Sequence, residues 1–226
     1  MLVKNLLPGL KKKFQPRGEQ THSSETGQGP HTHKESNKHS IFQTIGILLL
    51  APIMAFFLTA FVFQSYQVDG PSMEYALQNN DRLIIYKLPR TWAKITGRSY
   101  IPRRGDVVVF TKHDLAQYEN ADGDRQLIKR VIGLPGERVV VKEGKLVVYN
   151  DKNPKGFEPD NTLPYGAKIN STSGNIDLTV PNNEVFVCGD NRDNSLDSRT
   201  FGTIPVKDIV GKLTFRLFPL SEAKKF

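Results

Sequence analysis

The chain has 226 residues, enough for one compact domain of ordinary size, and its formal net charge at pH 7 is +8. Residues 1–40 hold seven Lys and Arg against three Glu, a net +4, so half of the positive excess lies in this N-terminal stretch. The single cysteine, Cys188, excludes an intrachain disulfide framework and a cysteine-rich metal site. Only one of the five histidines, His113, follows residue 40, so we expect neither a metal centre nor a cofactor in the folded part.

Residues 41–63 form one apolar stretch without a charged side chain. At the helical rise, these residues span about 34 Å, which exceeds the roughly 30 Å of a hydrocarbon core. A cleavable signal peptide would be shorter, would begin closer to the N-terminus, and would end at a small-x-small site, whereas Gln64-Ser65-Tyr66-Gln67 follows here. We therefore predict an uncleaved transmembrane anchor.

The charges on either side of this stretch predict its orientation. Seven Lys and Arg precede it, and none occurs between residues 64 and 81. Because the positively charged flank stays in the cytoplasm, residues 64–226 should lie outside the cytoplasm, in a single-pass protein of the cell (plasma) membrane. Residues 1–40, rich in Gln, Ser, Gly, Thr, His and Lys, predict a disordered basic cytoplasmic tail.

Residues 64–226 contain short runs rich in Val, Ile and Phe, separated by Gly, Pro, Asn and Asp, which is typical of a mainly β domain. The predicted strands are 82–86, 106–110, 126–133, 138–141, 145–150, 184–188 and 212–218. The chain between 139 and 148 folds back at Lys142-Glu143-Gly144, which predicts a hairpin. Residues 151–181, rich in Pro, Gly, Asn and Ser, predict a surface insertion. The expected fold is an antiparallel β-sheet domain behind one N-terminal transmembrane helix.

Two short segments contain a candidate nucleophile and a candidate base. Ser72 follows Val68-Asp69-Gly70-Pro71 soon after the anchor, and taken alone it could be an ordinary turn serine. Strand alternation in Leu127–Glu137 places Lys129 and Arg130 on opposite faces, so one of these cations should lie among apolar groups. Desolvation would lower a lysine pKa and supply a neutral amine. The alternative is a pair of edge-strand cations that keep their charges in water.

The third segment, residues 189–199, reads GDNRDNSLDSR. Asp193, Ser195 and Asp197 alternate as in a calcium loop. Ser198 replaces the turn glycine of such a loop, and Ile204 stands where its bidentate Glu belongs, so we reject that interpretation. The alternating charges favour an internally cross-linked ionic network over a solvated loop.

In this order behind one anchor, the three segments resemble the type I signal peptidases (leader peptidases) of bacteria, over most of residues 41–218. The resemblance implies a β-sheet catalytic domain of signal-peptidase type and a membrane-bound serine endopeptidase. That enzyme would remove signal peptides from exported preproteins through an acyl-enzyme at the outer membrane face. It also implies that Ser72 is the nucleophile, Lys129 the general base and Ser195 the hydroxyl that orients the lysine. The residues implied to form the ionic scaffold are Asp190, Arg130, Asp197 and Arg199. The implied partners are signal-peptide-bearing preproteins, the lipid bilayer and a nearby secretion translocon, with no nucleic acid.

The inventory of residues also favours a Ser-Lys pair. A serine nucleophile must lose its proton to a positioned base, and His113 is the only histidine of the outer part. A Ser-His-Asp triad would depend on that one residue, which lies between Lys112 and Asp114. Alternation along an extended chain before Ser72 also predicts a set of residues that line shallow apolar substrate pockets. These residues are Tyr66, Val68, Met73, Leu77 and Ile128.

One departure from the family pattern keeps other functions open. Tyr75-Ala76 stands where the family has Pro-Thr after the nucleophile, and Gly70 stands where some relatives have a second serine donor for the oxyanion. A catalytically silent paralogue that binds exported chains is one alternative. The other is a sortase-like cysteine transpeptidase that uses Cys188, His113 and an arginine.

Overall fold

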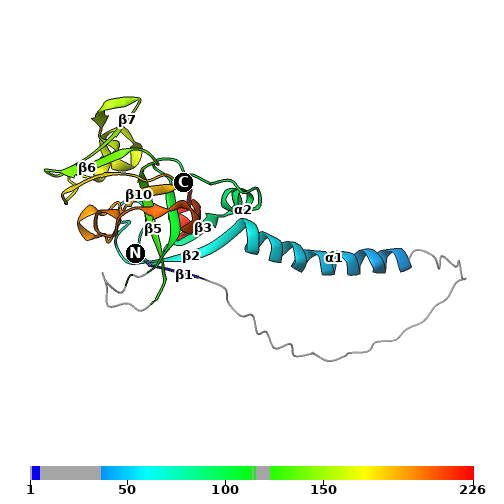
Figure 1. Cartoon of the computed structure of the whole chain (residues 1–226). Helices are drawn as coiled ribbons and strands as arrows, with labels where there is room; N and C mark the ends of the chain where they lie inside the picture. The colour runs from blue at the N-terminus through cyan, green and yellow to red at the C-terminus, as the bar shows by residue number, and fades with distance from the viewer. Residues whose placement is uncertain (1, 6–36, 114, 116–122) are drawn as a thin grey trace, which may run out of the picture. The chain divides into compact units, whose positions relative to one another are not determined.

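The computed structural model describes residues 2–5, 37–113, 115 and 123–226. The described residues fall into two compact units (Figure 1). One contains residues 2–5 and 59–226, and the other contains residues 37–58.

The apolar stretch is helical. Helix α1 (Asn37–Phe57) continues into a π-helical turn, Leu58–Val62, and Pro52 lies inside α1. Residues Gln43–Val62 form a helix with a mean hydropathy of 2.5, long and apolar enough to cross a membrane. The helix begins four residues before the apolar stretch predicted from the sequence.

The larger sheet contains all the predicted strands outside the hairpin. Its strands are β1 (Leu2–Asn5), β2 (Phe63–Asp69), β3 (Arg82–Tyr86), β4 (Val107–Lys112), β5 (Arg125–Gly133), β10 (Glu184–Cys188), β11 (Ile204–Pro205), β12 (Ile209–Phe218) and β13 (Lys224–Lys225). They follow the order β1-β2-β3-β12-β4-β5-β10-β11, with β13 against β12. Every strand pair among the described residues is antiparallel, which confirms the predicted fold class.

Strand β1 lies within the stretch for which composition predicted disorder. It runs antiparallel to β2, with Leu2 opposite Asp69 and Asn5 opposite Tyr66 (Figure 1). Leu2 also pairs with Leu127 of β5. Strand β1 therefore fills the space between β2 and β5 and closes these strands into a ring with β3, β12 and β4. Of the rest of the predicted tail, residue 1 and residues 6–36 lie outside the described residues, and residues 37–40 form the first turn of α1.

The smaller sheet contains the predicted hairpin. Its order is β8 (Asn153–Phe157), β7 (Lys145–Asn150), β6 (Arg138–Lys142) and β9 (Ile176–Thr179). Glu143 and Gly144, with φ of 52° and 78°, form the turn between β6 and β7, and two left-handed residues match the twist of a two-residue hairpin. The predicted surface insertion, 151–181, thus supplies two strands, β8 and β9, to this sheet.

Short helices connect the strands. They are α2 (Leu88–Ile95), α3 (Pro159–Thr162), α4 (Ser198–Phe201) and the 3₁₀ turns Pro164–Lys168, Arg192–Asn194, Val206–Asp208 and Leu220–Glu222. The five predicted pocket residues, Tyr66, Val68, Met73, Leu77 and Ile128, lie together in one core cluster, each at most 1% exposed. The core thus fixes the end of β2 and the middle of β5, from which the candidate site extends.

Candidate active site

The side chains of Ser72 and Lys129 contact each other, and both are buried beside strand β5 of the larger sheet. Ser72 lies in the turn that follows β2, and Lys129 lies in the middle of β5, opposite Val108 of β4. The Lys129 Nζ donates a hydrogen bond to Ser72 Oγ over 2.6 Å. Lys129 is fully buried and Ser72 is 2% exposed, so bulk water is kept from both groups.

The turn that carries Ser72 is held by its own backbone. The Glu74 N–H donates to the Pro71 carbonyl, and the Leu77 N–H donates to the Met73 carbonyl, so the chain reverses directly after Ser72. Tyr75 has a φ of 86°, in the left-handed region. Proline has its φ fixed near −65°, so the family's proline could not adopt this conformation.

The 189–199 segment packs directly on the backbone of Ser72. The Asn191 N–H donates to the Ser72 carbonyl over 3.1 Å, and the Asn191 side chain donates to Pro71 O and to Glu74 Oε2. A methyl group built on Gly189 would lie 2.4 Å from the Ser72 carbonyl oxygen and 2.3 Å from Ser195 Oγ. Only glycine therefore allows this close approach. Ser195 lies at the site, and its predicted contact with Lys129 stays a prediction.

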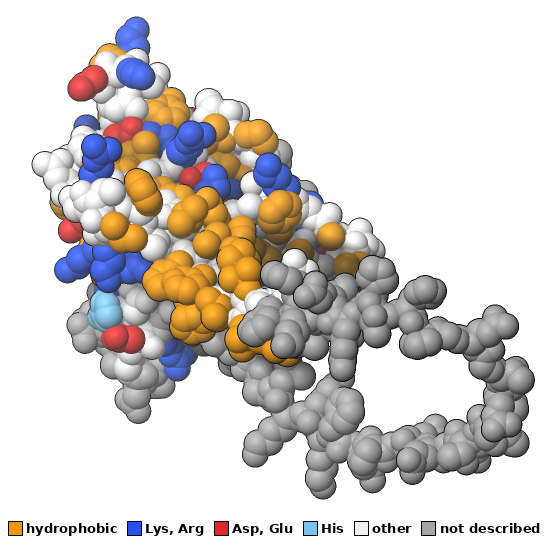
Figure 2. All heavy atoms as spheres, turned by 90° about the vertical axis from the view of Figure 1, so that its right-hand side faces the viewer, with side chains coloured by type: hydrophobic (Ala, Val, Ile, Leu, Met, Phe, Trp, Pro, Cys, Tyr) orange, Lys and Arg blue, Asp and Glu red, His pale blue; other side chains and the backbone are white. Residues whose placement is uncertain are grey.

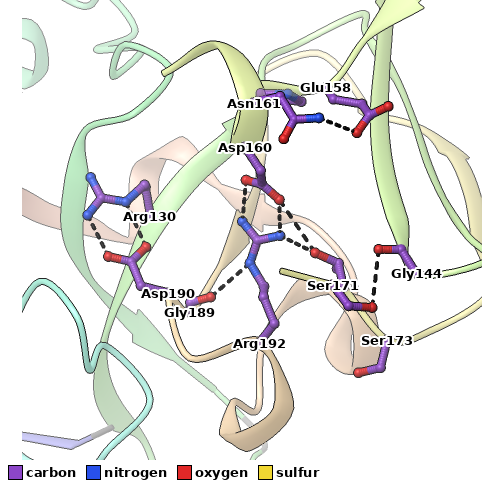
Figure 3. Close-up of polar contacts among 12 residues, drawn as sticks. Arg130, Gly144, Glu158, Asp160, Asn161, Ser171, Ser173, Gly189, Asp190 and Arg192 are labelled. Carbon is purple, nitrogen blue, oxygen red and sulfur yellow. Dashed lines mark hydrogen bonds and ion pairs between the residues drawn. The ribbon is translucent and has the colours of Figure 1, made fainter. Parts of the chain in front are cut away.

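Arg130 and Asp190 form the first ion pair beside the site. Arg130 donates from Nε and Nη2 to the two Asp190 oxygens over 2.7 and 2.6 Å, a bidentate arrangement that Figure 3 shows. Arg130 Nη1 donates to the Gly105 carbonyl, and the guanidinium lies over the Tyr165 ring at 4.4 Å. Lys129 and Arg130 point to opposite faces of β5, as alternation predicted, and both are buried.

Asp197 and Arg199 form a second pair, with two contacts of 2.9 Å. Asp197 Oδ2 also accepts the Gly189 N–H, and Arg199 Nη2 donates to the Arg192 carbonyl. Burial by itself raises the pKa of Asp197, but the hydrogen bonds and positive charge of Arg199 outweigh it and lower this pKa below the ordinary value. The four residues expected to form an ionic scaffold thus lie in two pairs near Ser72.

Sequence reasoning missed a third pair, Arg192 with Asp160. Arg192 Nη2 donates to Asp160 Oδ1 over 2.6 Å, and its Nη1 contacts Asp160 and Thr172. Arg192 Nε donates to the Gly189 carbonyl (Figure 3). Arg192 belongs to the charged motif and could have been suspected, but nothing in the sequence marks Asp160, which lies in the insertion 151–181.

Breaking this third pair should destabilise the domain. Asp160→Ala leaves the guanidinium of Arg192, whose side chain is 2% exposed, without its carboxylate. The free energy of unfolding should fall by about 3–5 kcal/mol, as for other buried pairs that lose one partner. Urea denaturation measures this loss, and the exposed acid Asp151→Ala is the matched control. Equal midpoints for the two variants would contradict the role given to Asp160.

The lowered pKa of Asp197 predicts acid sensitivity. An aspartate titrates near 3.9 in the unfolded chain and below that value in the folded one, so its stabilisation is present above about pH 4 and is lost as pH falls through the folded pKa. Asp197→Asn should therefore flatten the dependence of the urea midpoint on pH between about pH 5 and pH 3. The exposed acid Asp151 is the control because solvent screens its charge. An equal flattening by Asp151→Asn would argue against the assignment.

The residues required by a cysteine enzyme are poorly placed. Cys188 is fully buried in the core, and burial raises the pKa of its thiol. A reactive cysteine needs an accessible thiolate. The His113 side chain is half exposed and contacts Asp124 at 2.7 Å. These placements argue against a sortase-like reaction. Within the described part of the chain, no group of three or more His, Cys, Asp or Glu could hold a metal ion.

A cavity of about 500 Å³ lies beside the Arg130–Asp190 pair. Tyr75 and Ala76 line one part of it, and Tyr165 and Phe226 line another. The two residues that depart from the family pattern therefore face open space next to the site. None of the five predicted pocket residues lines this cavity, and their role in binding stays a prediction.

Comparison with known proteins decides the family. A family model described as signal peptidase, peptidase S26, matches residues 41–218. The chain belongs to this family.

The relatives of this S26 peptidase include a probable signal peptidase I-1 of Synechocystis sp., 34% identical over 80% of this chain and 84% of the relative. A signal peptidase I of Bacillus licheniformis is 32% identical and is matched over 84% of this chain and 95% of its own length. Among solved structures, a signal peptidase I of Enterococcus faecalis V583 is 29% identical, with a TM-score of 0.37, over 50% of this chain and 97% of that one. As an S26 family member, the chain is a hydrolase that cleaves peptide bonds.

Proposed function

We propose that this S26 peptidase removes N-terminal signal peptides from exported preproteins, with Ser72 as nucleophile and Lys129 as general base. The observation that carries the proposal is the 2.6 Å contact between Ser72 Oγ and Lys129 Nζ in a buried setting. A neutral amine at this distance can take the hydroxyl proton as the oxygen attacks a carbonyl carbon. No histidine of the described part contacts Ser72 by any hydrogen bond we observe, which leaves the lysine as the base.

The proposed reaction has two halves. Ser72 Oγ attacks the scissile carbonyl while its proton passes to Lys129 Nζ, and a tetrahedral oxyanion forms. The oxyanion collapses to an acyl-enzyme, and the departing amine, which becomes the new N-terminus, takes the proton back from Lys129. Water then attacks the ester with Lys129 again as the base, and the signal peptide leaves as a carboxylic acid. The Ser72 N–H is the proposed donor to the oxyanion, because Pro71 has no N–H to give.

The proposed substrate path is the space between β2 and β5. Strand β1 pairs with both of these strands, so an extended chain can satisfy backbone groups on both sides. Added strands of this kind bind through main-chain hydrogen bonds. Lys129 lies two residues beyond Leu127, which Leu2 opposes, so a substrate along the same path would pass close to the nucleophile.

We also propose that the apolar helix anchors the enzyme in the plasma membrane, with the N-terminus in the cytoplasm and residues 64–226 outside. The helix Gln43–Val62 and the positive flank before it support this topology. The bilayer and the secretion translocon are then the enzyme's neighbours. In this orientation Leu2–Asn5 and the catalytic domain lie on opposite sides of the membrane, so the space that β1 fills would be open to a preprotein.

The test is cleavage of a preprotein with an Ala-x-Ala site by the full-length protein in lipid vesicles. Wild type should cut after the second alanine, Ser72→Ala should not, and circular dichroism should show both folded. A thiol-alkylating reagent should leave the rate unchanged. If folded wild type cut none of several preproteins, the silent paralogue would be the better interpretation.

The topology predicts a difference between vesicles and detergent. In detergent no barrier separates residues 2–5 from the catalytic domain, so β1 competes with the substrate, and deletion of these residues should raise kcat/KM. In sealed vesicles the same deletion should change nothing. A deletion that raised kcat/KM equally in both media would contradict the proposed orientation. Replacing Leu2–Asn5 by four glycines is the control for chain length.

A further inference from the structure

Ser72 lies in a loop whose two ends are joined to each other. This loop, residues 70–81, connects β2 to β3 and is called the Ser72 loop. At its base the Val68 N–H donates to the Asp81 carbonyl, and the Asn80 N–H donates to the Val68 carbonyl, both over 2.9 Å. The ends of the loop are thus fixed to the sheet, and the position of Ser72 depends on what holds the loop between them.

Arg216 of β12 holds the second half of the Ser72 loop. Its Nη1 donates to Asp81 Oδ2 over 3.0 Å and, over 3.5 Å, to the Ala76 carbonyl. Asp81 Oδ2 also accepts the Gln78 N–H over 2.9 Å, so the carboxylate connects the guanidinium to a second part of the loop backbone. The first half of the loop is held by the 189–199 segment. The two halves therefore depend on two different parts of the chain.

The other side of the Arg216 guanidinium is bound to the short turn Leu220–Glu222. Its Nε donates to the Glu222 carbonyl over 2.9 Å, and its Nη2 lies 3.0 Å from Glu222 Oε2. Strand β13, which follows this turn, pairs with β12 at Arg216. Ala76 and Phe226 pack against the same core cluster. The guanidinium is therefore a bridge between the Ser72 loop and residues 220–226.

The direction of the Arg216 side chain runs against the pattern of its strand. Its neighbours Phe215 and Leu217 are 40% and 47% exposed, while Arg216 is 7% exposed. Figure 2 shows hydrophobic side chains gathered in a broad group on one face of the molecule, so an inward arginine reverses the usual arrangement. The register of β12 against β3 shifts on both sides of Arg216, between Leu213 and Phe215 and between Arg216 and Phe218. Bulges of this kind re-aim side chains next to active sites.

We propose that Arg216 is a positioning residue for Ser72. Its guanidinium fixes the second half of the Ser72 loop against residues 220–226, and so keeps Ser72 Oγ within hydrogen-bond reach of Lys129 Nζ. The path to Ser72 is short, because a backbone hydrogen bond joins Ala76 to the residue directly after Ser72. A small shift of this backbone lengthens the 2.6 Å contact on which proton transfer depends. This inference rests on the proposed function, in which Ser72 is the nucleophile.

Two variants separate positioning from stability. Arg216→Gln leaves the buried carboxylate of Asp81 without the guanidinium, so the urea midpoint should fall, and kcat for preprotein cleavage should fall at least about tenfold. Asp81→Asn/Arg216→Gln removes the unpaired charge and should restore most of the urea midpoint. Its kcat should stay at least about tenfold low, with KM changed less than about twofold, because no guanidinium holds Ala76. A wild-type kcat in the folded double variant would overturn the proposal, since Arg216 would then act on stability alone.

The matched control breaks another ion pair of the same strand. Lys212 Nζ lies 2.6 Å from Asp106 Oδ1, and both side chains are partly or largely buried. Lys212→Gln/Asp106→Asn should keep the wild-type kcat. All rates are measured on full-length protein in lipid vesicles, at a temperature at which circular dichroism shows each variant folded. An equal loss of kcat in this control would also overturn the proposal, because any broken pair on β12 would then have the same effect.

Hydrogen exchange separates this inference from the proposed function. In Arg216→Gln the amides of residues 73–81 should exchange at least about tenfold faster than in wild type, while those of β10 keep their rates. Faster exchange in the loop, with a wild type that cuts no preprotein, would contradict the proposed function and keep the hold of Arg216 on the loop. A wild type that cuts preproteins, with loop exchange unchanged by Arg216→Gln, would overturn this inference and leave the proposed function standing.

Discussion

Replacing Ser72 by alanine or Lys129 by methionine should each lower kcat for preprotein cleavage by at least about a thousandfold, with the fold intact. The reason is that the 2.6 Å pair acts as one unit. Without the hydroxyl no acyl-enzyme forms, and without the amine the hydroxyl keeps its proton. Methionine is close to lysine in length and apolar, so it should fill the buried space on β5. Single-turnover cleavage, with circular dichroism on each variant, measures the effect.

The double variant sharpens this prediction. If the two groups serve one step, Ser72→Ala/Lys129→Met should be no slower than either single variant, because residues that act as a unit are not additive. Ser99→Ala and Lys145→Met, both on exposed side chains, are the matched controls and should keep wild-type rates. Effects of the two single changes that multiplied in the double variant would show that the residues act independently.

Gly189→Ala should lower kcat by about a hundredfold although the new methyl group touches no substrate. The methyl would lie 2.4 Å from the Ser72 carbonyl oxygen, a backbone atom that cannot rotate away. The turn that carries Ser72 must therefore move, and a shift of about 1 Å is enough to cost this much. Overpacking should also lower the free energy of unfolding by about 1–3 kcal/mol. Cleavage rates and urea denaturation measure the two effects.

Gly136→Ala is the control for this change. Gly136 has a left-handed backbone, with a φ of 80°, and open space around the position of a Cβ. Alanine there should cost about 1–2 kcal/mol of stability through strain and leave kcat unchanged. If Gly189→Ala and Gly136→Ala lowered stability alike and both kept full activity, the close approach to Ser72 would have no catalytic role.

The sheet strands could be predicted because their pattern is local. Runs such as 82–86 and 184–188 match β3 and β10 residue for residue, and the hairpin at 142–145 follows from its turn residues. Strand β1 could not be predicted, since four residues in a polar tail gain their order from partners more than 60 positions away. Helix α2 was missed for another reason. Its eight residues contain a proline and only a short apolar repeat.

The candidate site could also be predicted only in part from the sequence. Alternation in β5 predicted that a cation would be buried, and the structure buries both Lys129 and Arg130 because each finds a partner. The motif 189–199 predicted an ionic network but not its partners. Asp160 is joined to Arg192 only by the folding of the insertion over the loop, and no spacing in the sequence encodes that contact.

Gly189 connects the ionic network to Ser72. Its N–H donates to Asp197, its carbonyl accepts from Arg192, and its α-carbon lies against the backbone of Ser72. Heat that loosens the short α3 segment would free Asp160, then Arg192, and then this glycine, while the hydrogen bonds of the large sheet stay in place. The enzyme should consequently lose activity on warming before its β-structure melts, and residues far from the peptide bond would set the temperature at which it stops working.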